Sequence, residues 1–182
     1  MSTGTTKNQL LHEASRMLLA KGLNGFSLQE LATSLDIKKS SLFHYFPSKN
    51  SLAVELYRFY QSSFISWVKK YEHLPHEKQI LKYAQKLTTW ICEKNRVCPV
   101  GALSLEWHLV GADLQSEIKK LHELQKFWLT NLFKGIDIRI PKTDAVIGTM
   151  ALIQGSIQLA RINEDPKLVV KNLKSYLKSI KK

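Results

Sequence analysis

Residues 27–49 read SLQELATSLDIKKSSLFHYFPSK, and this stretch determines how the rest of the chain is interpreted. Ser27 and Glu30 form the pattern of a capping box, in which two side chains satisfy free backbone groups at the start of a helix. The pattern predicts one short helix through Leu35 and a second from about Lys38 to Tyr45. Two short helices joined by a brief turn have the dimensions of a helix-turn-helix.

The apolar residues of this stretch are spaced so that one side of each helix faces inward; they are Leu28, Leu31, Ala32, Ile37, Leu42 and Phe46. The outward side chains of the second helix are cations, hydroxyls and aromatic rings, which can contact the phosphates and base edges of duplex DNA. In a helix-turn-helix the first helix supports the second, whose exposed face enters the major groove. Any two short amphipathic helices share this spacing, so the pattern alone leaves the function open.

The stretch from Leu10 through Leu52 closely resembles the N-terminal DNA-binding domain of the TetR family. The segment LFHYFPSKNSL at residues 42–52 carries this resemblance most specifically, and it is joined by Ala14, Leu18, Gly22, Ser27 and Ile37. The resemblance implies a transcriptional regulator, a repressor and not an enzyme, that binds DNA as a homodimer. It also implies a DNA-binding domain over residues 1–52 and a helical effector-binding and dimerisation domain over residues 53–182.

Carried over position by position, the resemblance implies which side chains meet DNA. The expected contacts to bases and groove walls are Lys38, Lys39, Ser40, Ser41 and His44. The expected contacts to the phosphate backbone are Ser27, Phe43, Tyr45 and Lys49. Ser27 and Lys49 also lie at helix N-termini, where free backbone N–H groups favour an anion. For Tyr45 the alternative is packing against the body of the protein.

Three residues depart from the family pattern. Asp36 occupies the turn position that usually holds glycine, and aspartate tolerates a left-handed backbone better than most residues. Ser40 replaces a frequent glycine on the side facing the groove. Phe43 replaces a frequent tyrosine and so lacks a hydroxyl that could bond phosphate. The operator sequence therefore does not transfer from the family.

Proline, glycine and polar pairs divide the remaining chain into further helices, which predicts an all-α fold of about nine helices. The short alternating run at residues 136–140 is interpreted as a linker. The helices expected outside residues 27–45 are one ending at Lys21-Gly22, one from Ser48 to Leu74-Pro75, one that follows it, one from Pro99 to near Gly111, one from Asp113 to about Phe133, and two covering roughly 143–162 and 166–181.

The net charge of +12 suits a polyanionic partner without locating the surface that binds it. Residues 1–52 carry six basic and three acidic residues, and the C-terminal helix adds an unbalanced lysine run that is typical of a solvated face. No apolar run approaches the roughly 18 residues that a membrane span needs, and the first residues are polar. We therefore expect a cytoplasmic protein without a membrane partner.

The last two helices are expected to pair with those of a second copy, as the resemblance implies. Small and apolar residues share one face of the first of these helices, namely Gly148, Ala151, Leu152, Gly155 and Leu159. The second helix contributes Val169, Leu173 and Leu177. Regulators of this class commonly use two-fold symmetry to read palindromes. The alternative is an internal core face.

Large aromatic residues are concentrated in the middle helices, where a small-molecule effector could stack. The candidates for this pocket are Trp67, Tyr83, Trp90, Trp107, His108 and Trp128. Each of them is equally consistent with ordinary core packing. The sequence does not identify the effector, and a regulator without any effector is an alternative.

Cys98 is a further candidate for the effector site. It lies at the expected start of a helix, close to Lys94 and Arg96, and both features favour the reactive thiolate. The segment CPVGALSLEW is similar to one in TetR-type repressors that respond to electrophiles and oxidants, the N-ethylmaleimide repressor among them. The alternative is a buried, inert cysteine.

The remaining chemistry is sparse. Cys92 and Cys98 are too few for a disulfide framework, and no Cys/His spacing provides the four ligands of structural zinc, so no metal or cofactor is expected. An enzyme using Cys98 with His108 or His122 is the alternative from another class of function. Nothing orders these groups into a catalytic set, and such an enzyme would leave residues 27–49 unexplained.

Overall fold

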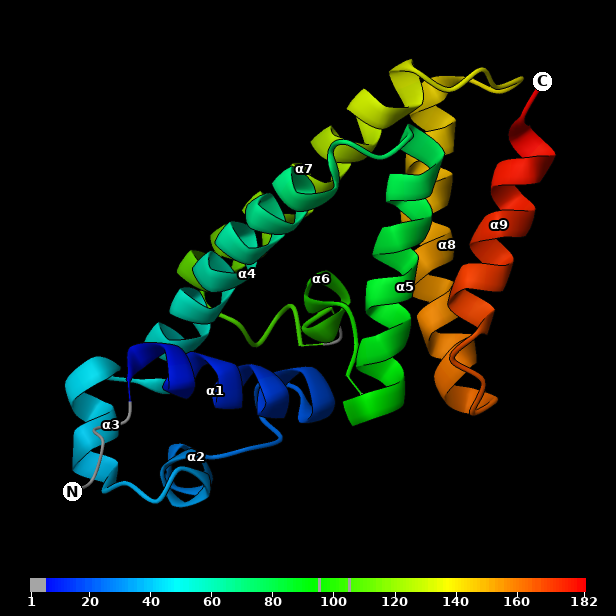
Figure 1. Cartoon of the computed structure of the whole chain (residues 1–182). Coiled ribbons are helices and arrows are strands. Elements are labelled where there is room, and N and C mark those ends of the chain that lie inside the picture. The colour runs from blue at the N-terminus through cyan, green and yellow to red at the C-terminus, as the bar shows by residue number, and fades with distance from the viewer. Residues whose placement is uncertain (1–5, 95, 105) are drawn as a thin grey trace. The chain divides into compact units, whose positions relative to one another are not determined.

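The structure is a computed structural model that describes residues 6–94, 96–104 and 106–182, with the backbone alone described at residues 90–94. The described residues form nine α-helices and no strand, which confirms the all-α prediction (Figure 1). Ile138 and Lys181 form an isolated antiparallel bridge. The helices are α1 (Lys7–Lys21), α2 (Leu28–Ser34), α3 (Lys39–Tyr45), α4 (Lys49–Tyr71), α5 (His76–Lys94), α6 (Pro99–Ala102), α7 (Ala112–Lys134), α8 (Lys142–Ile162) and α9 (Leu168–Ile180).

The chain packs as two compact units. Unit 1 consists of residues 1–63 and 99–121, and unit 2 consists of residues 64–98 and 122–182, as far as these are described. Helices α4 and α7 each contribute to both units. Residues 99–121 thus pack in the same unit as the N-terminal helices, although they are distant from them in the sequence.

Unit 1 is organised by the apolar faces of α1 and α4. Leu10, Ala14 and Leu18 of α1 are fully buried, as the helical spacing of these residues predicts. The Tyr60 hydroxyl of α4 donates to Ser15 Oγ at 2.9 Å, and the buried Tyr57 hydroxyl donates to the Pro99 carbonyl at 2.6 Å. These bonds join α1, α4 and the segment that starts with α6.

Helix α6 is much shorter than the sequence suggests. We expected a helix from Pro99 to near Gly111, but it ends at Ala102. The Ser104 hydroxyl donates to the Gly101 carbonyl at 2.8 Å, a local bond that competes with the helical pattern. Leu109 N donates to the carbonyl of Glu106 at 2.8 Å, three residues back, so the chain continues as tight turns.

In unit 2, α5, α8 and α9 lie side by side (Figure 1). Helix α9 buries one complete stripe, Val169, Leu173, Leu177 and Ile180, and its exposed residues are polar or basic, whereas Leu168, Val170 and Tyr176 are half-buried. The side chain of Asn172 donates to Ser156 Oγ at 3.1 Å and so fixes α9 against α8. Gly148 of α8 lies directly against the Tyr176 hydroxyl of α9, where a larger residue would collide with the ring.

Helix α8 qualifies the expectation that no segment could span a membrane. It is 21 residues long, with a mean hydropathy of 1.3 over its most apolar window, so by length and composition it could cross a bilayer. Its buried residues, Val146, Ile153 and Ile157 among them, pack within unit 2 instead. Its other side exposes apolar residues, of which Ile147 and Ile162 are the most accessible.

Candidate nucleic-acid interface and ligand-binding region

Helices α2 and α3 form the predicted helix-turn-helix (Figure 1). The Ser27 hydroxyl accepts from Glu30 N at 3.0 Å, and the Glu30 carboxylate accepts from Ser27 N, so the predicted capping box is present. Leu31, Ala32 and Leu42 have no exposed surface, and they form the buried contact between the two helices. This contact fixes the orientation of α3.

The turn between the two helices requires a left-handed residue, and Asp36 provides it. Its φ angle is 50°, in the region expected from the glycine that it replaces. Ile37 N donates to the Ala32 carbonyl at 3.0 Å and Asp36 N donates to the Thr33 carbonyl at 3.1 Å. These bonds close the turn, after which α3 begins at Lys39.

The outer face of α3 is cationic and polar and lies open to solvent. Phe43 and Tyr45 expose 41% and 42% of their surface, so Tyr45 does not pack into the body of the protein. The other predicted base and groove contacts, Lys38, Lys39, Ser40, Ser41 and His44, are also exposed. Helix α3 contains no acidic residue. Its exposed surface therefore combines positive charge with hydroxyl and aromatic groups.

Lys49, which was expected to contact phosphate, has a structural partner of its own. Its ammonium donates to the Phe26 carbonyl and lies 4.7 Å from the centre of the Phe26 ring. Burial lowers the pKa of Lys49 from its usual value, although Glu106 and Glu30 oppose this change. Lys49 thus connects the start of α4 to the residue preceding the α2 cap.

Sequence reasoning missed Glu106, which lies in the turns after α6. Its carboxylate accepts from Leu23 N at 2.9 Å, from Asn24 N at 3.2 Å and from Asn24 Nδ2 at 2.7 Å. These three bonds fix the connection between α1 and α2, and with it the position at which the helix-turn-helix begins. A sequence separation of more than eighty residues leaves no local pattern that could have revealed them.

A second link within unit 1 joins the start of α4 to the start of α7. Asn50 Nδ2 donates to Asp113 Oδ2 at 2.8 Å, and this bond is the main reason that the pKa of Asp113 is lowered. Glu117 accepts from Gln61 Nε2 at 2.8 Å and pairs with Lys120 at 2.8 Å. The N-terminal part of α7 is therefore bound to the same helix that carries Lys49.

The structure separates the predicted effector residues into two groups. Trp107 and His108 belong to unit 1, where Trp107 is partly exposed and His108 is exposed. Trp67, Tyr83 and Trp128 belong to unit 2 and meet there. The side chain of Trp90 lies outside the described residues.

Phe64 completes a cluster with Trp67, Tyr83 and Trp128, which we call the aromatic cluster. Every pair of its rings is in contact, with centroid separations from 5.3 to 6.3 Å. The four rings therefore pack directly against one another. Gln125 Nε2 donates to the Tyr83 hydroxyl at 3.0 Å, whereas the buried Trp128 Nε1 has no hydrogen-bond partner among the described residues.

Cys98 is 1% exposed and lies beside this cluster in unit 2. Burial raises the pKa of Tyr83 well above its usual value, and the neighbouring Cys98 adds to this effect. Burial also lowers the pKa of Lys86 to about 8, a change that Cys98 opposes. The Lys86 ammonium lies 5.7 Å from the centre of the Trp67 ring. Thiol, phenol and amine thus share one poorly solvated region.

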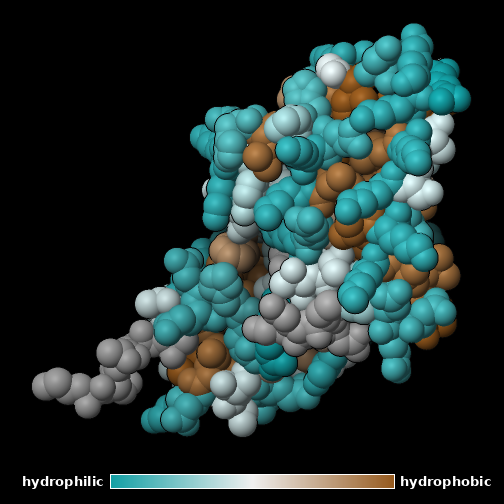
Figure 2. Space-filling view, turned by 45° about the vertical axis from the view of Figure 1, so that its right-hand side comes forward, coloured by the Kyte–Doolittle hydropathy of each residue, from teal (hydrophilic) through white to brown (hydrophobic). Residues whose placement is uncertain are grey.

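The residues expected at a dimer interface lie on different sides of their helices. Ala151, Gly155 and Leu159 of α8 are exposed, and Leu152 is half-buried. No atom lies within 4 Å of the position that a Cβ of Gly155 would take. Val169, Leu173 and Leu177 of α9 are buried within unit 2, where they already have packing partners. On the face seen in Figure 2, hydrophobic surface is interspersed among hydrophilic side chains.

Helices α2 and α3 pack through a buried contact, and α3 presents a cationic face to solvent. These features define a DNA-binding protein of the helix-turn-helix class. Residues 10–56 match the family described as bacterial regulatory proteins, tetR family. The helix-turn-helix region of this chain thus matches the DNA-binding domain of this family, and the match, together with the similar regulators, supports a TetR-family transcriptional regulator. Among the described residues, no group of three or more His, Cys, Asp or Glu could hold a metal ion.

Two curated relatives have similar sequences. An uncharacterised HTH-type transcriptional regulator in the lacX 3′ region of Lactococcus lactis is 23% identical over 182 residues, covering 92% of this chain and 89% of the relative. The HTH-type transcriptional repressor NemR of Escherichia coli K12 is 26% identical over 121 residues, covering 63% of this chain and 60% of NemR. The similarity thus extends beyond the helix-turn-helix.

Solved structures share the fold over nearly all of the chain. A TetR transcriptional regulator from Legionella pneumophila matches with a TM-score of 0.87 and 22% identity, with complete coverage of both chains. The regulator FadR of Bacillus subtilis, solved in complex with stearoyl-CoA, matches with a TM-score of 0.72 and 13% identity, covering 95% of this chain and 96% of FadR.

Proposed function

We propose that this chain is a repressor that binds a palindromic operator in the cytoplasm as a homodimer and leaves it when a small-molecule effector binds. The observation that carries the proposal is the outer face of α3, where cations, hydroxyls and aromatic rings are exposed together. A helix presented in this way can enter the major groove.

The side chains of α3 divide into two roles. Lys38, Lys39 and Ser40 lie at its N-terminal end, the part of a recognition helix that reaches base edges, and Ser41 and His44 continue along the groove. Phe43 and Tyr45 face the phosphate backbone, together with Ser27 and the free backbone N–H groups at the start of α4. The Lys49 side chain supports this surface from within, through its bond to Phe26.

The dimer contact that we propose uses the exposed stripe of α8. Ile147, Ala151, Gly155, Leu159 and Ile162 follow one another at helical spacing, and Ile162 exposes 77% of its surface. An apolar face of this kind is favourable to cover, and the small residues at its centre allow two backbones to approach closely. Val169, Leu173 and Leu177 support this interface from inside unit 2.

We place the effector at the aromatic cluster of unit 2. The buried Trp128 Nε1 has no hydrogen-bond partner among the described residues, and a ligand with an acceptor group would provide one. The rings touch one another, so a ligand must separate them as it enters, and this movement is the conformational change that we infer. FadR, solved with stearoyl-CoA, supports the idea that this fold admits a ligand.

Selection of bound sequences from random duplex DNA tests the proposal directly. The purified full chain should enrich a palindrome whose half-sites are about one helical turn, near 34–36 Å, apart. A chain carrying both Ser40→Glu and His44→Glu keeps the buried contact between α2 and α3 and should enrich no DNA sequence. Enrichment of a non-palindromic sequence would refute the dimeric arrangement, and indifference to all duplexes would refute the function.

The surroundings of Cys98 favour a second candidate function, a repressor that senses electrophiles. Lys86, whose pKa is lowered to about 8, lies in the same buried region as the thiol, so its neutral amine can accept the thiol proton and its ammonium can then pair with the thiolate. N-ethylmaleimide should then release the operator from the wild-type chain and from Cys92→Ser, but not from Cys98→Ser. Equal release from Cys98→Ser would exclude this function.

A further inference from the structure

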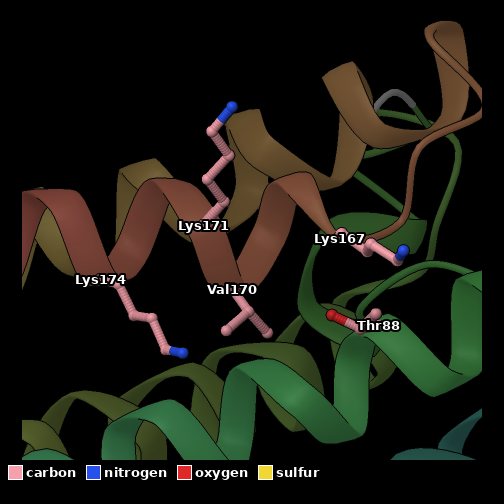
Figure 3. Close-up of a pocket in the computed structure, with 5 residues that line it drawn as sticks. All are labelled: Thr88, Lys167, Val170, Lys171 and Lys174. Carbon is pink, nitrogen blue, oxygen red and sulfur yellow. The ribbon is translucent and has the colours of Figure 1, made fainter.

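A hollow of about 450 Å3 lies between α5 and α9, on the surface of unit 2. Thr88, Lys167, Val170, Lys171 and Lys174 line it (Figure 3). Val170 and Lys174 extend from α9 toward α5, where Thr88 extends back, whereas the end of Lys171 points away from α5. The volume is in the range of small-molecule sites and is separate from the aromatic cluster.

The floor of the hollow is apolar. Val170 contributes an aliphatic side chain, and the Thr88 hydroxyl donates to the Ala84 carbonyl of its own helix at 3.0 Å. With its hydroxyl engaged, Thr88 contributes mainly a methyl group. The methylene stems of the lysines extend this apolar surface and leave their charges at the rim. An apolar group resting on this floor would lose contact with water.

The rim of the hollow carries positive charge that the described residues do not neutralise. Lys167, Lys171 and Lys174 form no ion pair with any described residue, and α9 contains no acidic residue. Asp165 precedes the rim in the sequence; its carboxylate accepts from the backbone N of Lys167 at 3.0 Å and forms no ion pair with the three lysine side chains of the rim. The carboxylate of Glu77 on α5 pairs with Lys181 instead.

We propose that this hollow binds an anionic amphiphile, with its apolar part over Val170 and Thr88 and its carboxylate or phosphate at the lysine rim, beside Lys174. The apolar floor distinguishes such a ligand from an extended polyanion, which needs charge alone. The ligand's head neutralises the rim, and its tail covers the floor. The proposal concerns unit 2 alone and holds whether or not the operator proposal is correct.

Calorimetric titration of the full chain separates the two parts of the ligand. Decanoate and decyl phosphate, both below their micellar concentrations, should each bind saturably at one site per subunit. Inorganic phosphate has the head alone and decyl glucoside has the tail alone, so each should bind at least tenfold more weakly. Equal binding of decyl glucoside, or tight binding of polyglutamate, would overturn the proposal. The ratio between the first two ligands tells whether the head is a carboxylate or a phosphate.

Three variants locate the site. Val170→Trp fills the hollow and Lys174→Glu reverses the charge at its rim, so each should weaken the binding of decyl phosphate at least tenfold. Lys178→Glu makes the same charge change one turn further along α9, outside the hollow, and should leave binding unchanged. Lys174 is exposed, so its variant remains informative even if Val170→Trp does not fold. Equal loss in Lys174→Glu and Lys178→Glu would show diffuse attraction and refute the site.

Discussion

Glu106 holds Asn24 by two hydrogen bonds, one to its backbone N at 3.2 Å and one to its side-chain Nδ2 at 2.7 Å. Asn24 lies in the connection between α1 and α2, and Glu106 lies in the turns that follow α6. A single carboxylate thus connects the segment that precedes the helix-turn-helix to a segment of unit 1 that lies more than eighty residues later in the sequence. No other side chain in the described residues makes three hydrogen bonds to this connection.

Removal of this carboxylate should loosen the helix-turn-helix. Glu106→Ala leaves three donors without their acceptor, and partial solvation limits the expected loss to about 1–2 kcal/mol in the free energy of unfolding. Hydrogen exchange at the amides of Leu23 and Asn24 should accelerate more than tenfold. Glu123→Ala, an exposed change on α7, is the control. Unchanged exchange at both amides would show that the bonds do not hold the turn.

Lys39 should contribute to operator affinity mainly through charge. Lys39→Ala is expected to weaken binding on every duplex tested and to reduce by about 1 the slope of log affinity against log salt concentration. The measurement is a fluorescence titration at several salt concentrations. Lys69→Ala, an exposed lysine of α4 in unit 2, should leave both quantities unchanged. An effect confined to one operator sequence would instead indicate base reading.

The exposed stripe of α8 should govern the oligomeric state. Ala151→Glu places a charge at the centre of this stripe without disturbing the buried side of the helix, so it should convert a dimer to a monomer at micromolar concentration. Sedimentation velocity measures the change. Ser175→Glu, an exposed position on α9, is the matched control. A dimer that survives Ala151→Glu would move the interface elsewhere.

Lys86 should make the stability of the chain depend on pH. Its pKa is lowered from 10.5 to about 8 in the folded chain, so between these values the unfolded chain binds more protons. The free energy of unfolding therefore rises with pH in this window, by about 1 kcal/mol from pH 8 to about 9.5 after allowance for partial solvation. Tyr83 acts in the opposite direction above about pH 10, which sets the upper limit of the measurement.

Urea denaturation at a series of pH values tests this dependence. Lys86→Met keeps the length of the side chain but removes the titrating amine, so the difference in unfolding free energy between wild type and variant should shrink as pH rises. Lys82→Met, one turn earlier on α5, is the control for the removal of a charge. A constant difference between pH 8 and 9.5 would contradict the assigned environment of Lys86.

The elements that local chemistry specifies were predictable from the sequence. Ser27 and Glu30 specify the start of α2 because the capping box lies within four residues, and Asp36 specifies the turn because few residues tolerate its backbone angle. The exposure of the α3 side chains followed from the burial of Leu31, Ala32 and Leu42 on the opposite side.

Features that depend on contacts distant in sequence were not predictable in this way. Periodicity marked Val169, Leu173 and Leu177 as an apolar stripe, but it could not tell whether the stripe packs within the subunit or against a second copy. The aromatic residues were recognised as a group, but only the coordinates show that three of them, Trp67, Tyr83 and Trp128, form one cluster with Phe64, which the sequence analysis missed. The bonds of Glu106 and the hollow beside Val170 arise from the tertiary arrangement alone.

The bond between Lys49 and the Phe26 carbonyl has a mechanical consequence. Lys49 is the first residue of α4, a rod of 23 residues, and Phe26 directly precedes the cap of α2. If α4 slides along its axis or rotates about it, the Lys49 ammonium displaces the Phe26 carbonyl and with it the start of α2. Helix α3 then moves with α2, because the two helices pack against each other. The orientation of α3 thus depends on the position of α4, and α2 and α3 can change their orientation together without unfolding.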